Sequence, residues 1–235
     1  MDNTVKTRGI SGAGLKWLAM ATMLIDHCAA VFGYKIITYF HSIVPYTCLR
    51  GIGRLAFPIF CFLLVEGYVH TSNRIKYGVR LFLFAIISEI PFDLAFNGSW
   101  LNWNSQNVFF TLTLGLIAIF VLEYFQSNPW IGRVLACGVV LAAELFHTDY
   151  SGAGVVLIVG FYIFREKEIY RILCAFLVLV VFGNVLEIVA LLAFLPIHFY
   201  NGERGWQIKY FFYIFYPAHL ILLWWLHSQN LVLRW

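Results

Sequence analysis

The amino-acid sequence predicts an all-α protein, a polytopic transmembrane helical bundle of about nine helices. Apolar residues make up 61% of the chain and charged residues only 12%, about half of the roughly 25% that soluble domains carry. Long apolar stretches recur with short polar breaks between them, which is typical of helices that cross a membrane. The sequence lacks the regular alternation of polar and apolar residues that membrane barrels show.

Nine apolar segments are expected to be helices, and they lie near 15–33, 49–70, 77–97, 107–126, 130–147, 151–165, 169–182, 184–199 and 210–228. The seventh and eighth are short for an apolar core about 30 Å thick, which needs about twenty residues. Only Gly183 and Asn184 separate them, so they are half-helices or one broken unit, and the count ranges from eight to ten. Residues 36–47, with His41 and Pro45, are expected to form a short amphipathic stretch at the membrane interface.

The positive charges predict a cytoplasmic amino terminus. With this orientation most lysines and arginines fall on the inner side, and the outer loop 98–106 has none, as the positive-inside rule requires. An eight-helix count would move Arg204 and Lys209 outside. The net charge of +4 follows from this bias, so no nucleic-acid partner is expected. We expect a cytoplasmic segment over 1–14 and a single membrane-embedded domain over 15–235.

Asp26 and His27 are an adjacent carboxylate and imidazole inside the first apolar segment. An ionised side chain at mid-bilayer costs roughly 2.5–3.5 kcal/mol, so the pair needs protein partners or a role in proton transfer. It also interrupts the apolar run that a cleaved signal peptide would need. Adjacent helical residues point about 100° apart, so a partner that orients His27 must come from another helix. A packing role for His27 stays open.

Further polar residues are expected near the outer ends of the helices. Arg50 and Arg54 lie four residues apart on the second segment, and Glu89 and Asp93 are spaced in the same way on the third. Such groups at one depth either neutralise each other inside the bundle or form an outward-facing polar cavity for a water-soluble substrate. The expected cavity residues are Arg50, Glu89, Asp93, Asn107, Asp149, Tyr150, Tyr216 and His219.

A basic set lies on the inner side and consists of Lys16, Arg74, Lys76 and Arg80. These residues either anchor the protein by the positive-inside rule or bind the phosphates of a nucleotide. Lys16 and His27 are eleven residues apart, roughly 16 Å along a helix, which is comparable to the reach of a pantetheine arm. A nucleotide at the inner mouth would therefore present a thioester at the depth of His27.

The last apolar segment contains a second imidazole, His219. His219 is the other mid-membrane imidazole, and Pro217 removes a backbone hydrogen bond beside it.

The sequence contains no metal-binding motif, serine-nucleophile elbow, phosphate-binding glycine loop or dinucleotide fingerprint. A redox enzyme with a bound cofactor is therefore not expected, and neither is a metal site.

Several blocks of the sequence resemble the TraX-type proteins, the F-pilin acetylase family. The similarity covers roughly residues 15–222 and weakens between 160 and 200. The blocks are LKW (15–17), MLIDH (23–27), RGIGRLAFPIF (50–60), SEIPFDL (88–94), QNVFFTL (106–112), Asp149-Tyr150 and FYPAHL (215–220).

The resemblance implies a multi-pass acetyltransferase of the bacterial inner membrane, with acetyl-CoA as the acyl donor and a peptide or saccharide as the acceptor. The best-known relative acetylates the amino terminus of pilin. More distantly similar acyltransferases carry a basic residue ahead of a histidine in their first helix, as Lys16 and His27 do here. We expect His27, Asp26 and Arg54 to be catalytic, with His27 as general base and Arg54 as oxyanion donor. The residues expected to bind CoA are Lys16, Arg74, Lys76 and Arg80.

Two other classes of function stay open. A proton-coupled transporter or flippase would use Asp26, His27, Glu89 and Asp93 as a relay and Gly183-Asn184 as a broken-helix site, although the sequence has no internal repeat of the kind that many transporters show. A non-catalytic assembly partner of a surface fibre would bind no CoA and would tolerate substitution of His27.

Overall fold

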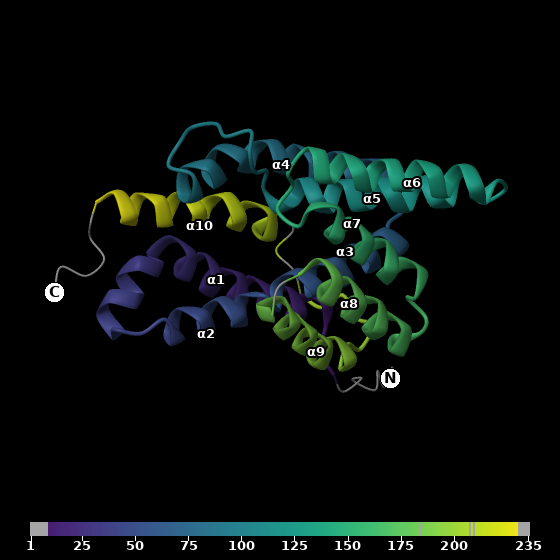
Figure 1. Cartoon of the computed structure of the whole chain (residues 1–235). Helices are drawn as coiled ribbons and strands as arrows, with labels where there is room; N and C mark the ends of the chain where they lie inside the picture. Colours follow the sequence, from purple (N-terminus) through teal and green to yellow (C-terminus); the bar gives the residue numbers. More distant parts are fainter. Residues whose placement is uncertain (1–8, 184, 207, 209, 230–235) are drawn as a thin grey trace.

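The computed structural model describes residues 9–183, 185–206, 208 and 210–229. Within these residues it contains ten α-helices, one 3-10 helix and no β-sheet, which confirms the predicted all-α class (Figure 1). The elements are α1 (Gly12–Phe40), α2 (Val44–Gly53), α3 (Ala56–His70), α4 (Arg74–Phe96), α5 (Val108–Tyr124), α6 (Pro129–Leu145), α7 (Ser151–Ile163), α8 (Glu168–Phe182), η1 (Val185–Ala193), α9 (Phe194–His198) and α10 (Phe211–Ser228).

Two pairs of elements continue each other, so the described residues form nine helical units, as predicted. Arg54 and Leu55 join α2 to α3 with backbone angles that stay in the right-handed helical region. The 3-10 helix η1 runs directly into α9. The eighth predicted segment is therefore helical, but most of it has the tighter 3-10 winding.

The expectation of a separate amphipathic stretch over 36–47 is wrong. α1 continues to Phe40 and ends where His41 adopts a left-handed conformation with φ of 49°. Pro45 lies in the first turn of α2, where its fixed φ suits a helix and its missing N–H removes no hydrogen bond. These residues therefore form the ends and the turn of an α1–α2 hairpin.

The amino-terminal end of α1 also differs from the expected boundary at residue 15. Ser11 caps the helix by accepting a hydrogen bond from the Gly14 amide at 3.2 Å, so α1 begins at Gly12. The loop before α10 lies against this end, and the Gly12 amide donates to the Glu203 carbonyl at 2.8 Å. Residues 1–8 of the expected segment 1–14 lie outside the described part of the chain.

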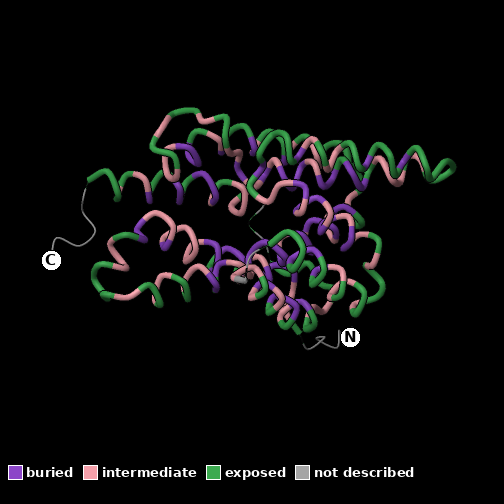
Figure 2. Tube along the Cα trace, in the orientation of Figure 1, coloured by how far each residue is buried: buried purple, intermediate pink, exposed green. Residues whose placement is uncertain are grey.

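The helices are arranged around α3. The α1–α2 hairpin and α10 extend towards one end of the molecule, and the α5–α6 hairpin extends towards the other (Figure 1). α3 packs against α1, α7 and η1, and α10 packs against α4 and α1. Buried residues concentrate where these helices face one another (Figure 2), and Ile59, Cys61 and Val65 of α3 are almost fully buried. The middle of α1 thereby comes next to the turn between α6 and α7.

The outward faces of several helices are apolar. α8 buries Ala175, Val178 and Leu179 and exposes Leu173, Phe176, Leu177, Val180 and Val181. Among the described residues, two helical units are long and apolar enough to cross a membrane, Gly12–Phe40 and Val44–His70. Val108–Tyr124, Ser151–Ile163 and Leu186–His198 are apolar but shorter.

We expect Gly53→Ala to destabilise the protein, because a Cβ at this position of α2 would overlap the side chain of Asp26 in α1. Overpacking of this kind typically costs about 1–3 kcal/mol, and thermal unfolding of the purified protein in detergent measures it. Gly78→Ala in α4 is the matched control, since nothing lies within 4 Å of a Cβ there and alanine is the better helix former by about 1 kcal/mol. Equal changes of Tm in the two variants would contradict this packing.

Candidate functional site

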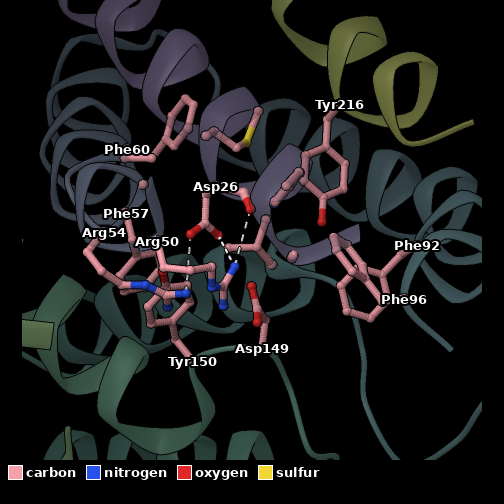
Figure 3. Close-up of a pocket in the computed structure, with 16 residues that line it drawn as sticks. Asp26, Arg50, Arg54, Phe57, Phe60, Phe92, Phe96, Asp149, Tyr150 and Tyr216 are labelled. Carbon is pink, nitrogen blue, oxygen red and sulfur yellow. Dashed lines mark hydrogen bonds and ion pairs between the residues drawn. The ribbon is translucent and has the colours of Figure 1, made fainter. Parts of the chain in front are cut away.

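A cavity of about 180 Å³ lies between α1, the α2–α3 unit, α4, α10 and the α6–α7 turn. The charged groups lie on one side of it together with Phe57, Phe60 and Tyr150, and Phe92, Phe96 and Tyr216 lie on the other side (Figure 3). Its lining residues are Met23, Asp26, His27, Ala30, Arg50, Gly53, Arg54, Ala56, Phe57, Phe60, Phe92, Phe96, Val108, Asp149, Tyr150 and Tyr216. The structure thus brings together residues from six separate parts of the chain, since Val108 at the start of α5 also lines the cavity.

The charged side of the cavity is built on the Asp26 carboxylate. Arg50 Nη1 lies 2.7 Å from Asp26 Oδ2, and Arg54 Nη2 lies 3.4 Å from Oδ1 (Figure 3). The other side of Arg54 contacts Glu187 of η1, at 3.0 Å from Nη1 to Oε1. Exposed fractions of these four side chains range from 12 to 22%. Removing one partner from a fully buried pair typically costs about 3–5 kcal/mol, and the cost is smaller in these partly buried pairs. The cluster joins α1, the α2–α3 unit and η1.

The local sequence explains why this cluster forms. Arg50 and Arg54 are one turn apart, and this spacing puts both guanidinium groups on the face of α2 that meets α1. Gly51 and Gly53 between them are buried, and the missing side chain of Gly53 leaves the space that Asp26 occupies. The close approach of the two helices therefore depends on the RGIGR segment.

Aromatic rings line the cavity on both sides. The rings of Phe57 and Tyr150 stack beside the arginines with centroids 3.5 Å apart, and Phe92 and Phe96 line the opposite side (Figure 3). Electrostatic interactions strengthen in such an environment, because its effective dielectric constant is lower than that of water.

His27 lines the cavity on a different face of α1 from Asp26 and contacts the last helix. Its Nδ1 lies 2.7 Å from Nε2 of His219, and the two rings are nearly parallel, with an interplanar angle of 10°. His219 is 5% exposed, and its Nδ1 lies 2.7 Å from the Phe215 carbonyl oxygen. The orienting partner that the sequence requires from another helix is therefore an imidazole in this structure.

Asp149 lies in the α6–α7 turn and borders the cavity (Figure 3). Asp149 has an exposed surface, although many protein atoms surround its carboxyl group. Burial raises the pKa of the Asp149 carboxyl group to about 6, against the opposing effect of Arg54 and Arg50. Burial also raises the pKa of Tyr150 well above its usual value, so this phenol stays protonated near neutral pH.

Glu89, Asp93 and Asn107 form a separate cluster that does not line the cavity. The Asn107 side-chain amide donates to Glu89 at 2.5 Å, and the Asn102 backbone amide donates to Asp93 at 2.6 Å. The expectation that these carboxylates neutralise the two arginines is wrong, because Asp26 and Glu187 take that place. Glu89 and Asp93 instead fasten the loop after α4 to the helix.

The expected basic set is divided in space. Lys16 Nζ lies 5.3 Å from the centroid of the Phe212 ring, and the Arg80 guanidinium lies 5.8 Å from that of Tyr213, so both lie beside the start of α10. Arg74 instead forms an ion pair of 2.6 Å with Glu123 of α5. Lys76 is exposed in the first turn of α4.

Glu187 and the phenylalanines of the cavity lining are absent from the site predicted from the sequence. Glu187 is the single charged residue in the otherwise apolar run 185–197, and the same argument that singles out Asp26 applies to it. The phenylalanines have no comparable signal, since the chain contains 23 of them.

The fold and the cavity define an all-α protein with a small, charged, partly open cavity and apolar outer helix faces. Comparison with known proteins gives the family: the model of the TraX protein family matches residues 11–227, and the chain belongs to this family. A relative described as "Probable fimbrial assembly protein FimC, serogroup H1" from Dichelobacter nodosus is 32% identical, over 89% of this chain and 92% of the relative. No solved structure matches the chain.

We expect Asp149→Asn to stabilise the protein at pH 7.5, with a gain in Tm that shrinks at pH 4.5. The folded-state pKa of about 6 lies above the usual value of 3.8, so ionisation of Asp149 opposes folding. The loss of folding stability caused by ionised Asp149 is complete above pH 6 and disappears as the pH falls towards 4. Glu166→Gln is the control, because this side chain is 84% exposed. A gain in Tm that is equal at both pH values would rule out a perturbed Asp149.

Proposed function

We propose that the protein is an integral acyltransferase of the bacterial inner membrane that moves a small acyl group from a cytoplasmic CoA thioester to an amine or hydroxyl. The observation that carries this proposal is the cavity, which brings the imidazole of His27 next to the Asp26–Arg50–Arg54 cluster. Acyl transfer uses a general base that takes the proton of the acceptor and hydrogen-bond donors that stabilise the oxyanion. This small site contains groups of both kinds.

The outer helix faces support a position in the membrane. Large apolar side chains are exposed on α4, α6, α8 and α10, and examples are Ile86, Leu141, Leu177 and Leu222. Soluble monomers rarely expose contiguous apolar patches larger than a few hundred Å², whereas lipid is the natural solvent for such faces. The cytoplasmic amino terminus and the multi-pass topology are part of this proposal.

The donor would enter along α1 from the inner side. α1 is helical without interruption between Lys16 and His27, so these residues are separated by roughly 16 Å. Lys16 and Arg80 beside the start of α10 are the proposed contacts of the CoA phosphates. Arg74 contributes less to this site because Glu123 already neutralises it, and Lys76 adds charge at the rim.

The size of the cavity favours a short acyl group. At about 180 Å³ it is smaller than the roughly 300–1,000 Å³ that is typical of small-molecule pockets. An acetyl thioester and the reacting atom of an acceptor fit this space, whereas a nucleotide must stay outside it. Acetyl-CoA is therefore the proposed co-substrate.

The proposed reaction uses His27 as general base. As the acceptor nitrogen or oxygen attacks the thioester carbonyl, its proton passes to His27, and Arg54 stabilises the oxyanion. The carbon–sulfur bond then breaks, and the sulfur takes the proton from His27, which leaves the acylated acceptor and free CoA. Asp26 holds both arginines in position for this step.

The relative's name refers to fimbrial assembly, and this favours a pilin-like peptide as the acceptor, with its amino terminus as the acylated group. The same name also favours a second candidate, a non-catalytic role in assembling a surface fibre. The two candidates differ in whether the protein binds and turns over acetyl-CoA.

His27→Ala is expected to lower the rate of free CoA release by about 10²–10⁴-fold, because positioned general bases contribute this much. The release of the CoA thiol from acetyl-CoA by purified protein, with a pilin-like peptide as acceptor, measures the rate. His70→Ala is the control, since the His70 side chain is 71% exposed and lies outside the cavity lining. Wild-type turnover by the His27→Ala protein would remove His27 from the mechanism.

The Lys16→Ala/Arg80→Ala protein is expected to bind acetyl-CoA at least about tenfold more weakly than wild type, because charge-assisted contacts to phosphate contribute about 1.5–3 kcal/mol each. Calorimetry of detergent-purified protein measures the affinity. Arg133→Ala/Arg165→Ala removes the same charge from exposed positions and should bind normally. The absence of binding by well-folded wild type would favour the assembly role.

A further inference from the structure

The contacts of His219 determine which of its nitrogens carries hydrogen. Its Nδ1 lies 2.7 Å from the Phe215 carbonyl oxygen, and a carbonyl oxygen only accepts hydrogen bonds. His219 Nδ1 must therefore carry the hydrogen. In a neutral imidazole the other nitrogen then has a lone pair, so Nε2 of His219 is an acceptor.

The same reasoning carries on to His27. Its Nδ1 lies 2.7 Å from Nε2 of His219, and this contact is a hydrogen bond only if His27 Nδ1 is the donor. The lone pair of a neutral His27 must then be on Nε2. Neutral imidazole in water prefers the opposite arrangement, with hydrogen on Nε2, so the contact with His219 reverses the usual preference.

Nε2 of His27 is the ring nitrogen whose lone pair can accept a proton in the proposed reaction. It makes no hydrogen bond with any residue that the structure describes, and it is not among the fully buried side-chain atoms that lack a partner. Because His27 lines the cavity, its lone pair is available to a group bound there.

The surroundings of His219 keep its ring in place. It is 5% exposed and stacks on Phe215, with ring centroids 4.8 Å apart. The ring of Tyr216 meets it edge-on at 5.7 Å. Packing and the Phe215 carbonyl thus fix the ring, and within the described part of the chain no charged side chain bonds to it.

We infer that His219 is a positioning residue, which holds His27 in the tautomer with hydrogen on Nδ1 and the basic lone pair on Nε2. This inference rests on the proposed function for its catalytic consequence. During the reaction the acceptor's proton moves to Nε2 of His27, and the hydrogen bond from Nδ1 to His219 stabilises the imidazolium that forms. When the proton leaves for the CoA sulfur, the same tautomer is restored.

Nitrogen-15 NMR of histidine-labelled protein in lipid nanodiscs tests the tautomer directly, and His27→Gln assigns the signal. We expect wild-type His27 to show a protonated Nδ1 and an unprotonated Nε2 at pH 7.5, and His219→Leu to lose this pattern. Hydrogen on Nε2 of His27 in wild type would overturn the inference. The result does not depend on activity, so it is informative even if the protein proves not to be an acyltransferase.

Kinetics test the catalytic consequence with two variants of His219. His219→Leu should lower kcat for CoA release by at least about tenfold, within the range that a general base contributes, with little change in KM. His219→Gln should recover most of the loss, because its amide oxygen can accept the hydrogen bond from His27 Nδ1. Equal losses in a folded Leu and a folded Gln variant, or no loss in either, would contradict a positioning role.

Discussion

A carboxylate in the middle of an apolar helix is stable only if cations reach it, and the arrangement of the first three helices follows from this requirement. Asp26 of α1 forms ion pairs with Arg50 and Arg54, and the missing side chain of Gly53 leaves space for this close contact. Glu187 then brings η1 to the other side of Arg54. Because breaking one buried pair costs about as much as a sizeable part of a domain's net stability, the cluster determines how these elements pack. The cavity is the space that remains beside it.

Much of this arrangement could be predicted from the sequence. Apolar runs predict nine helical units, and Asp26, His27, Arg50 and Arg54 stand out because charge is rare among apolar residues. Which carboxylate meets which arginine could not be predicted, because it depends on how helices far apart in the chain pack. Glu89 and Asp93 have a spacing that matches that of the two arginines, but they lie on α4. There the Asn107 side chain and the Asn102 backbone amide donate hydrogen bonds to them. The contact between His27 and His219 spans 192 positions and is invisible without the fold.

The two adjacent polar residues of α1 have different partners because they point in different directions. Asp26 faces α2 and its arginines, and His27 faces α10 and His219. The structural part of the site is thus charged and paired, whereas the proposed chemical part is a pair of imidazoles with one open nitrogen. The chain belongs to the TraX family and is similar to a protein described as a probable fimbrial assembly protein. The cavity is the reason that we propose acyl transfer in place of a purely assembling role.

The most direct test of this account is the position of a bound donor. We would determine the structure of the protein in lipid nanodiscs with a non-hydrolysable thioether analogue of acetyl-CoA. The account predicts that the nucleotide binds beside Lys16 and Arg80 and that the acyl end lies in the cavity, within hydrogen-bonding distance of Arg54 and next to Nε2 of His27. An analogue bound elsewhere, with the cavity empty, would contradict the assignment of this site to acyl transfer.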